Sequence, residues 1–162
     1  MTGKDIENYL IELGIPPNDA RVLAATAYGE SRYDAKAELK TSKEDSVGLF
    51  QINMYAHQDL LRQLTGSDDI NTWRKWLQDP INNIRAAVEV YKRRKAGPTK
   101  NGLTAWTIYS SGAWKEYVNK YEKATVKNAP VNTSNAPVNT GESILRPAHT
   151  PKWKQVWDDF LI

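Results

Sequence analysis

One glutamate in the chain has the surroundings that a catalytic acid needs. Glu30 comes at the end of an alanine-rich apolar segment, directly after Tyr28 and Gly29. Partial burial at such a place disfavours the ionised carboxylate and raises its pKa. A general acid needs this shift, because it must hold its proton at neutral pH until a leaving group takes it. Since most glutamates at helix ends are solvated surface residues, Glu30 needs support from other segments.

The composition leaves few other routes to chemistry. The chain has 162 residues, no cysteine and two histidines, His57 and His149. The lack of cysteine excludes disulfides, thiolate metal sites and cysteine nucleophiles. Two histidines supply a zinc site or a Ser-His-Asp triad poorly. We therefore expect no metal and no cofactor, and catalysis that relies on carboxylates and tyrosines.

Start and stop signals predict a mostly helical domain around Glu30. Thr2 followed by acidic residues opens a first helix that stops at Gly14, and Pro16 and Pro17 open a second that ends near Glu30. Further helices are predicted over residues 57–64, 72–77, 80–95 and 114–124. Residues 34–45 are predicted to form a polar loop, and residues 47–53 suit a short strand or tight turn. The expected fold class is mainly α, an α+β arrangement with a minimal β region.

Five short motifs occur in an order that is specific to one superfamily. They are Glu30-Ser31, Asp34-Ala35, Gly48-Leu49-Phe50-Gln51-Ile52-Asn53, Asp79 to Ile84, and Ala105 to Gly112. This set resembles the lysozyme-like fold, in particular its soluble lytic transglycosylase branch, and most of all the tail-associated peptidoglycan-degrading domains of bacteriophages. The resemblance covers about residues 5 to 122. Its most specific part is the combination of Glu30-Ser31 with the Gly-Leu-Phe-Gln-Ile-Asn string that begins at Gly48.

The resemblance implies a role for each matching residue. Glu30 would be the acid/base that protonates the glycosidic oxygen of a MurNAc-GlcNAc bond in peptidoglycan glycan strands, and Tyr109 would face it with its hydroxyl. The implied substrate-binding residues are Ser31, Gly48, Gln51 and Asn53. Ser31 would orient the carboxylate or contact the substrate, and Gly48 would let the chain approach a sugar closely. Two alternatives stay open. Gln51 and Asn53 could satisfy backbone groups instead. The side chains of Trp73, Trp76 and Trp106 could stack on sugar rings, although packing in the core is the favoured role.

A second carboxylate would decide between two reactions. In animal lysozymes that have one, it stands just before the glycine of this string, where the present chain has Ser46. A single glutamate favours the transglycosylase route, which gives 1,6-anhydro ends. The alternative is a hydrolytic lysozyme that uses Asp45 as second carboxylate. Asp45 is the immediate neighbour of Ser46 and Glu44 is the next, so a one-residue shift in the loop could still deliver a carboxylate.

The end of the chain has a different character, and the predicted division is residues 1–125, 126–142 and 143–162. Residues 126–142 contain a tandem seven-residue duplication, which predicts a low-complexity linker. Residues 143–162 predict an amphipathic helix with Trp153, Val156, Trp157, Phe160 and Leu161 on one face. This tail either folds back on its own domain or docks onto a partner, for which a phage structural protein is expected.

Charge and hydropathy bear on partners and location. Residues 70–127 contain 12 basic and 4 acidic residues, which suits an anionic cell wall. No nucleic-acid motif accompanies them, so nucleic-acid binding is not expected. No apolar stretch predicts membrane insertion or a signal peptide. We expect synthesis in the host cytoplasm and carriage in a virion to the bacterial cell wall or periplasm. A non-catalytic structural virion protein that keeps the fold is a further alternative.

Overall fold

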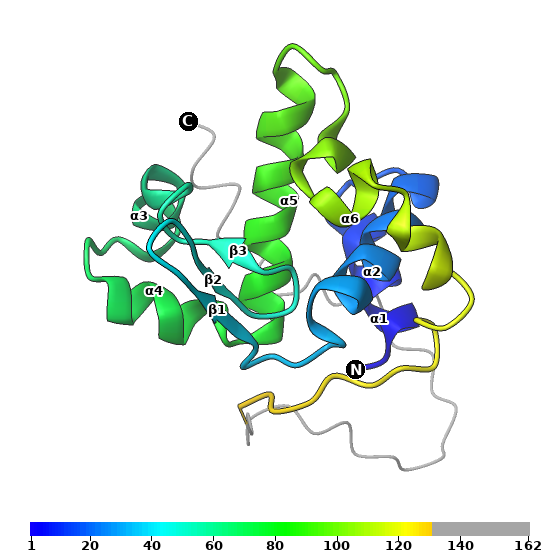
Figure 1. Cartoon of the computed structure of the whole chain (residues 1–162), viewed down its shortest axis with the longest axis horizontal. Helices are drawn as coiled ribbons and strands as arrows, with labels where there is room; N and C mark the ends of the chain where they lie inside the picture. The colour runs from blue at the N-terminus through cyan, green and yellow to red at the C-terminus, as the bar shows by residue number, and fades with distance from the viewer. Residues whose placement is uncertain (131–162) are drawn as a thin grey trace, which may run out of the picture. The chain divides into compact units, whose positions relative to one another are not determined.

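The computed structural model describes residues 1–130 as a helical domain with a small antiparallel sheet (Figure 1). The α-helices are α1 (Gly3–Glu12), α2 (Pro17–Ser31), α3 (Gln58–Thr65), α4 (Ile70–Leu77), α5 (Pro80–Ala96) and α6 (Thr107–Ser110). The 3-10 helices are η1 (Gly102–Ala105) and η2 (Ala113–Glu116), and the strands are β1 (Glu38–Lys40), β2 (Asp45–Val47) and β3 (Ile52–Asn53). The predicted mainly α, α+β fold class is confirmed. The predicted linker beyond residue 130 and the predicted helix over residues 143–162 lie outside the described residues.

Local capping explains why the predicted helices begin and end where they do. The Thr2 side chain accepts from the backbone N–H of Asp5 while the Asp5 side chain accepts from the backbone of Thr2, a reciprocal cap at the start of α1. Pro17 occupies the first turn of α2, where its missing N–H costs nothing. Gly66 ends α3 in the left-handed region, with φ of 66°. Asp69 and Asp79 cap α4 and α5 through their carboxylates.

The sheet is formed by three short antiparallel strands in the order β1-β2-β3. Glu38 pairs with Val47, and Ser46 pairs with Asn53. The predicted polar loop over residues 34–45 is therefore wrong over Glu38–Lys40, which forms β1. All three residues of β1 are exposed, so the sequence carries no alternation of apolar and polar residues that would have indicated a strand.

The helix predicted over residues 114–124 is also wrong, because only the 3-10 turn η2 and further turns form there. Tyr121 is fully buried, and its hydroxyl donates to the Glu7 carboxylate. The backbone N–H groups of Gly3 and Lys4 lie in the first turn of α1 and have no partner within the helix. They donate instead to the carbonyl oxygens of Ala124 and Glu122. These long-range contacts outweigh the local helical pattern.

Helix α5 lies at the centre of the domain (Figure 1). The sheet, α3 and α4 lie to one side of it, and α1, α2 and α6 lie to the other. Its buried residues Ile84, Ala87 and Tyr91 join a core that includes Leu23 of α2 and Leu49 between the strands. Within residues 1–130, no helix has the length and apolar character needed to cross a bilayer.

The chain just after residue 124 remains bonded to the domain. Thr125 pairs with Thr2 in an antiparallel bridge, and Lys127 pairs with Asp34 in a parallel one. The Asn128 amide also donates to the Asp34 carboxylate at 2.9 Å. The domain boundary predicted at residue 125 stays a prediction, and truncation experiments should retain residues up to Pro130 to keep these contacts.

Candidate active site

Glu30 lies at the C-terminal end of α2, one residue before the helix ends. The next residue after the helix, Arg32, adopts the left-handed conformation with φ of 53° and turns the chain toward the sheet. Glu30 is half-buried. Gly29 permits close packing beside it, since a Cβ at Gly29 would come within 2.8 Å of the Tyr117 ring and 3.2 Å of Ile108 Cγ2. The glycine thus lets the segment with Ile108 lie directly against the end of α2.

The surroundings of Glu30 favour the protonated carboxyl group. Burial, and then the negative charge of the Glu44 carboxylate, raise the pKa of Glu30 to about 7. The backbone N–H of Ile108 donates to the carboxylate and opposes part of this rise. A carboxyl group with a pKa near neutrality can both give and take a proton at physiological pH, which is the property a general acid/base requires.

Ser31 joins α2 to the segment between β2 and β3. Its hydroxyl donates to the Leu49 carbonyl oxygen at 2.9 Å and accepts from the Tyr33 backbone N–H at 3.1 Å. Among the hydrogen bonds of residues 1–130, none joins Ser31 to the Glu30 carboxylate. The buried hydroxyl therefore orients Glu30 indirectly, by fixing the end of the helix against Leu49.

Gly48 is required for packing against α5 and the end of α4. Its φ is +80°, and an added Cβ would collide with the Asn83 amide nitrogen and with the Leu77 carbonyl oxygen. Asn83 is fully buried and donates to the carbonyl oxygens of Val47 and Leu77, both at 2.9 Å, while its own oxygen accepts from Phe50 N–H at 2.9 Å. Glycine is thus required at position 48 because the backbone there packs closely against Asn83. The predicted reason was a close approach of the backbone to a sugar.

Gln51 and Asn53 use their side chains to hold the chain in place. The Gln51 amide donates to the carbonyl oxygens of Ala37 and Gly48 at 3.1 and 2.9 Å. The Asn53 side-chain oxygen accepts from the backbone N–H groups of Tyr55 and Ala56 at 3.0 and 3.4 Å. Both side chains therefore form hydrogen bonds with backbone groups, which is the alternative that the sequence left open. Both residues are half-buried, so part of their surface is accessible to a ligand.

Tyr109 lies on α6, one residue after the Ile108 N–H that reaches Glu30. Its hydroxyl accepts from the Asn101 amide at 3.2 Å, and its ring stacks on Trp114 with centroids 6.3 Å apart. Within the described domain no hydrogen bond joins the Tyr109 hydroxyl to Glu30. Both rings of this stacked pair are half-buried, so part of their aromatic surface remains exposed.

Asp45, the predicted second carboxylate, is instead a buried ion-pair partner. Its Oδ2 lies 2.6 Å from Arg74 Nη2, and its side chain is 1% exposed. Arg74 also pairs with Glu38 at 3.0 Å, so this cluster connects the sheet to α4. Because Asp45 is buried and already paired with Arg74, it is not available as a second carboxylate. This corrects the alternative in which Asp45 has that role.

Glu44 is the carboxylate that the structure brings near Glu30, and its charge contributes to the raised pKa there. Glu44 comes just before β2, whose first residue, Asp45, is buried and paired with Arg74. Ser46 Oγ donates to Glu44 Oε1 at 2.6 Å. The sequence indicated Glu44 only as a neighbour of Asp45.

Two of the tryptophans considered for sugar stacking belong to the core. Trp73 is 4% exposed, and Trp106 is 6% exposed with its indole N–H donating to the Phe50 carbonyl oxygen at 3.0 Å. The core role is therefore the one that the structure supports for both. Across residues 1–130, no group of three His, Cys, Asp or Glu side chains is placed to hold a metal ion.

A mainly helical domain with a small antiparallel sheet agrees with the α+β lysozyme-like fold. The family described as lysozyme-like domain matches residues 7–98, and the chain belongs to that family. The family indicates a peptidoglycan-degrading glycosidase with peptidoglycan as its substrate. No curated protein and no solved structure is a significant match to the chain.

Proposed function

We propose that the protein is a muramidase that cleaves the MurNAc-GlcNAc β-1,4 bond of peptidoglycan with Glu30 as its acid/base. The observation that carries the proposal is the half-buried carboxyl group of Glu30, whose pKa of about 7 follows from burial and from the Glu44 charge. At neutral pH a large fraction of Glu30 is protonated and can donate to the glycosidic oxygen as the bond to the anomeric carbon breaks.

The proposed reaction is that of a lytic transglycosylase. After the glycosidic bond breaks, the N-acetyl group of the same MurNAc stabilises the positive charge at the anomeric carbon. The Glu30 carboxylate then takes the proton of the C6 hydroxyl as its oxygen bonds to the anomeric carbon. The product carries a 1,6-anhydro end, and Glu30 is protonated again. This route needs no second carboxylate, in agreement with Ser46 at the corresponding position.

A hydrolytic route with Glu44 is the second candidate. Glu44 is held by Ser46 at 2.6 Å, and its charge acts on Glu30. In this route Glu44 stabilises the positively charged sugar while Glu30 takes a proton from an attacking water. Mass spectrometry of digested peptidoglycan separates the two: anhydro ends support the transglycosylase, and reducing ends support the hydrolase. A Glu44→Gln variant should retain lysis on the first route and lose it on the second.

We also propose that the enzyme is carried in a phage particle and acts locally on the wall. The support is the sequence pattern after residue 125, with a duplicated linker and an apolar helix face that suits docking onto a structural protein. A full-length variant with Trp153→Ala and Trp157→Ala should lyse walls normally but be missing from assembled particles. If purified cell walls are not lysed at all, a non-catalytic structural role replaces the proposal. If Glu30→Gln lyses walls as well as the wild type, Glu30 is not the acid/base.

A further inference from the structure

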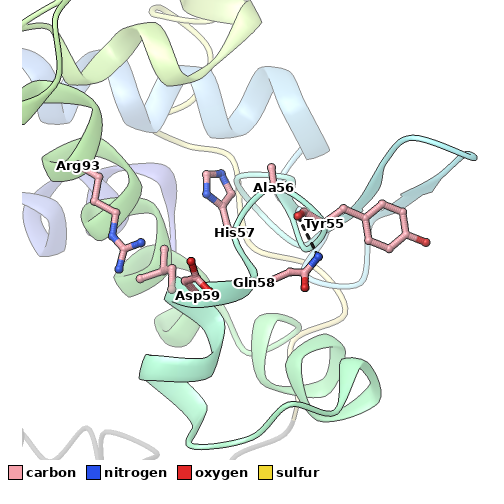
Figure 2. A pocket seen from close by; sticks show the side chains of 7 residues that line it. Tyr55, Ala56, His57, Gln58, Asp59 and Arg93 are labelled. Carbon is pink, nitrogen blue, oxygen red and sulfur yellow. Dashed lines mark hydrogen bonds between the residues drawn. The ribbon is translucent and has the colours of Figure 1, made fainter.

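An open polar cavity of about 330 Å³ lies at the surface between the loop after β3, the first turn of α3 and the last turns of α5 (Figure 2). It is lined by Tyr55, Ala56, His57, Gln58, Asp59, Leu60 and Arg93. None of these residues belongs to the candidate site around Glu30. Polar atoms form most of its wall, and its volume is at the lower end for small-ligand sites. The cavity therefore suits a small polar group.

Arg93 is an exposed residue that supplies a positive charge to the edge of this cavity. Figure 2 shows its side chain extending from α5 toward His57 and the first turn of α3, which carries Asp59. Arg93 Nη2 donates to the Gln63 amide oxygen at 2.7 Å, and a neutral amide does not cancel its charge. Within residues 1–130, none of the ion pairs includes Arg93. The one carboxylate in the lining, Asp59, is bonded to Arg62 at 2.8 Å.

His57 supplies a second donor next to Arg93. Burial, and then the positive charge of Arg93, lower the pKa of His57. The imidazole is therefore neutral at neutral pH and offers one N–H donor. An anion bound in the cavity would accept from both side chains. It would also offset the Arg93 charge and so raise the pKa of His57.

The cavity wall is fixed to the strand that carries Asn53. The backbone N–H of Tyr55 donates to Asn53 Oδ1 at 3.0 Å, and the backbone N–H of His57 donates to the Asn53 carbonyl oxygen at 3.1 Å.

The glycan of peptidoglycan carries peptide stems with free carboxylates on its muramic acid residues. A carboxylate is the group that a planar guanidinium binds best, through two parallel hydrogen bonds.

We propose that this cavity binds a carboxylate of the peptide stem of peptidoglycan, with Arg93 and His57 as the donors. The inference rests on the proposed function, because it takes the peptidoglycan glycan as the polymer cleaved at Glu30. It adds a specificity element: the enzyme recognises the peptide-bearing polymer and not only its sugar chain.

The first test is the titration of His57 in the full chain by NMR. The chain has two histidines, so a His57→Gln variant assigns the signal. The probe is muramyl-L-alanyl-D-isoglutamine, which has one free carboxylate, and the control is its methyl ester. We expect the acid to raise the pKa of His57 by about half a unit or more and the ester to leave it unchanged. An equal shift with the ester, no shift with the acid, or the same shift with inorganic phosphate at equal concentration would overturn the proposal.

The second test uses matched variants of neighbouring arginines. Arg93→Gln should raise KM about tenfold on peptide-bearing peptidoglycan and leave KM unchanged on glycan from which an amidase has removed the stems. Arg94→Gln removes the same charge outside the cavity and should change neither value. Asp59→Asn removes the one carboxylate of the lining and should lower KM on the peptide-bearing polymer.

These outcomes separate the two proposals. Equal effects of the Arg93 and Arg94 variants would reduce the finding to general charge attraction and overturn the specific site. Wild-type cleavage of the peptide-free glycan reports the proposed function by itself. If neither the peptide-bearing polymer nor the peptide-free glycan is cleaved, the proposed function fails, whereas the His57 titration still reports on the cavity.

Discussion

The Ser31 hydroxyl donates a 2.9 Å hydrogen bond to the carbonyl oxygen of Leu49. This bond joins the end of the helix that carries Glu30 to the segment that leads into β3. Ser31 also accepts from the Tyr33 N–H, so it fixes the turn after the helix as well. The position of the candidate acid relative to the sheet therefore depends on a buried serine that does not contact the acid directly.

Replacement of Glu30 should abolish wall lysis. Glu30→Gln keeps the shape of the side chain but cannot transfer a proton, so we expect activity to fall by about 10² to 10⁴. Turbidity of purified cell walls measures the loss, and circular dichroism checks the fold. Glu12→Gln, at an exposed position on α1, is the matched control and should lyse walls normally. Retention of more than a tenth of the activity in Glu30→Gln would contradict the assignment.

The activity should depend on pH through the protonated form of Glu30. Since the pKa is raised to about 7, kcat/KM on a soluble glycan should fall about tenfold per pH unit above that value. Glu44→Gln removes a negative charge that raises this pKa, so the decline should begin at lower pH. A profile that does not move in Glu44→Gln would show that Glu44 has no electrostatic effect on the acid.

The same shift should make the folded state less stable as pH rises. The folded domain holds a proton on Glu30 with a pKa of about 7, whereas the unfolded chain releases it near the ordinary value of 4.5. Stability attributable to this group is therefore lost as pH rises between these two values. Glu30→Gln removes the loss and should be more stable than wild type by about 1–3 kcal/mol near pH 8, with no such advantage near pH 4. Urea unfolding at both pH values measures the difference.

Asp45 and Asp68 form ion pairs in contrasting environments. Asp45→Asn leaves Arg74 without its buried partner and should lower the free energy of unfolding by about 3 kcal/mol. Asp68→Asn removes an exposed partner of Arg62 and should cost less than about 1 kcal/mol. Thermal unfolding compares the two. Asp45→Asn should still lyse walls at temperatures where it is folded, and loss of lysis in a folded Asp45 variant would restore the two-carboxylate mechanism at that residue.

Alanine substitutions at two glycines distinguish the cost of backbone strain from the cost of a steric clash. Gly48 and Gly66 both have positive φ, +80° and +66°, so alanine at either place costs about 1–2 kcal/mol. Only at Gly48 would the added Cβ meet neighbours, including the Leu77 carbonyl oxygen at 2.6 Å. Gly48→Ala should therefore destabilise the domain clearly more than Gly66→Ala in denaturant unfolding. Equal costs would show that α4 and α5 can shift to accommodate the methyl group.

The helices could be predicted from the sequence because their signals are local. Pro17, Gly66 and Asp79 act on the turns in which they stand, and the structure places helix ends at or next to each of them. β1 was missed because its three residues are all exposed. The predicted helix over 114–124 failed because Tyr121 is held by Glu7, a residue 114 positions away.

The part of the candidate site that depends on local signals could also be predicted from the sequence. Glu30 can be selected as a candidate because its position at a helix end is visible in the sequence. The partners of the other residues are distant: Gln51 bonds to Ala37, and Asp45 pairs with Arg74. A single sequence does not show which of two adjacent carboxylates, at 44 and 45, faces Glu30, because a three-residue strand gives no burial pattern that separates its faces.

The bridge between Asp34 and Lys127 has a mechanical consequence. The Lys127 N–H donates to the Tyr33 carbonyl oxygen at 2.8 Å, and the Ala35 N–H donates to the Lys127 carbonyl oxygen at 2.9 Å. Tension applied to the chain beyond Pro130 would reach the turn that follows Glu30 before it reaches the core. A load that anchors the protein by its C-terminal end would thus pull on the same turn that sets the direction of the acid.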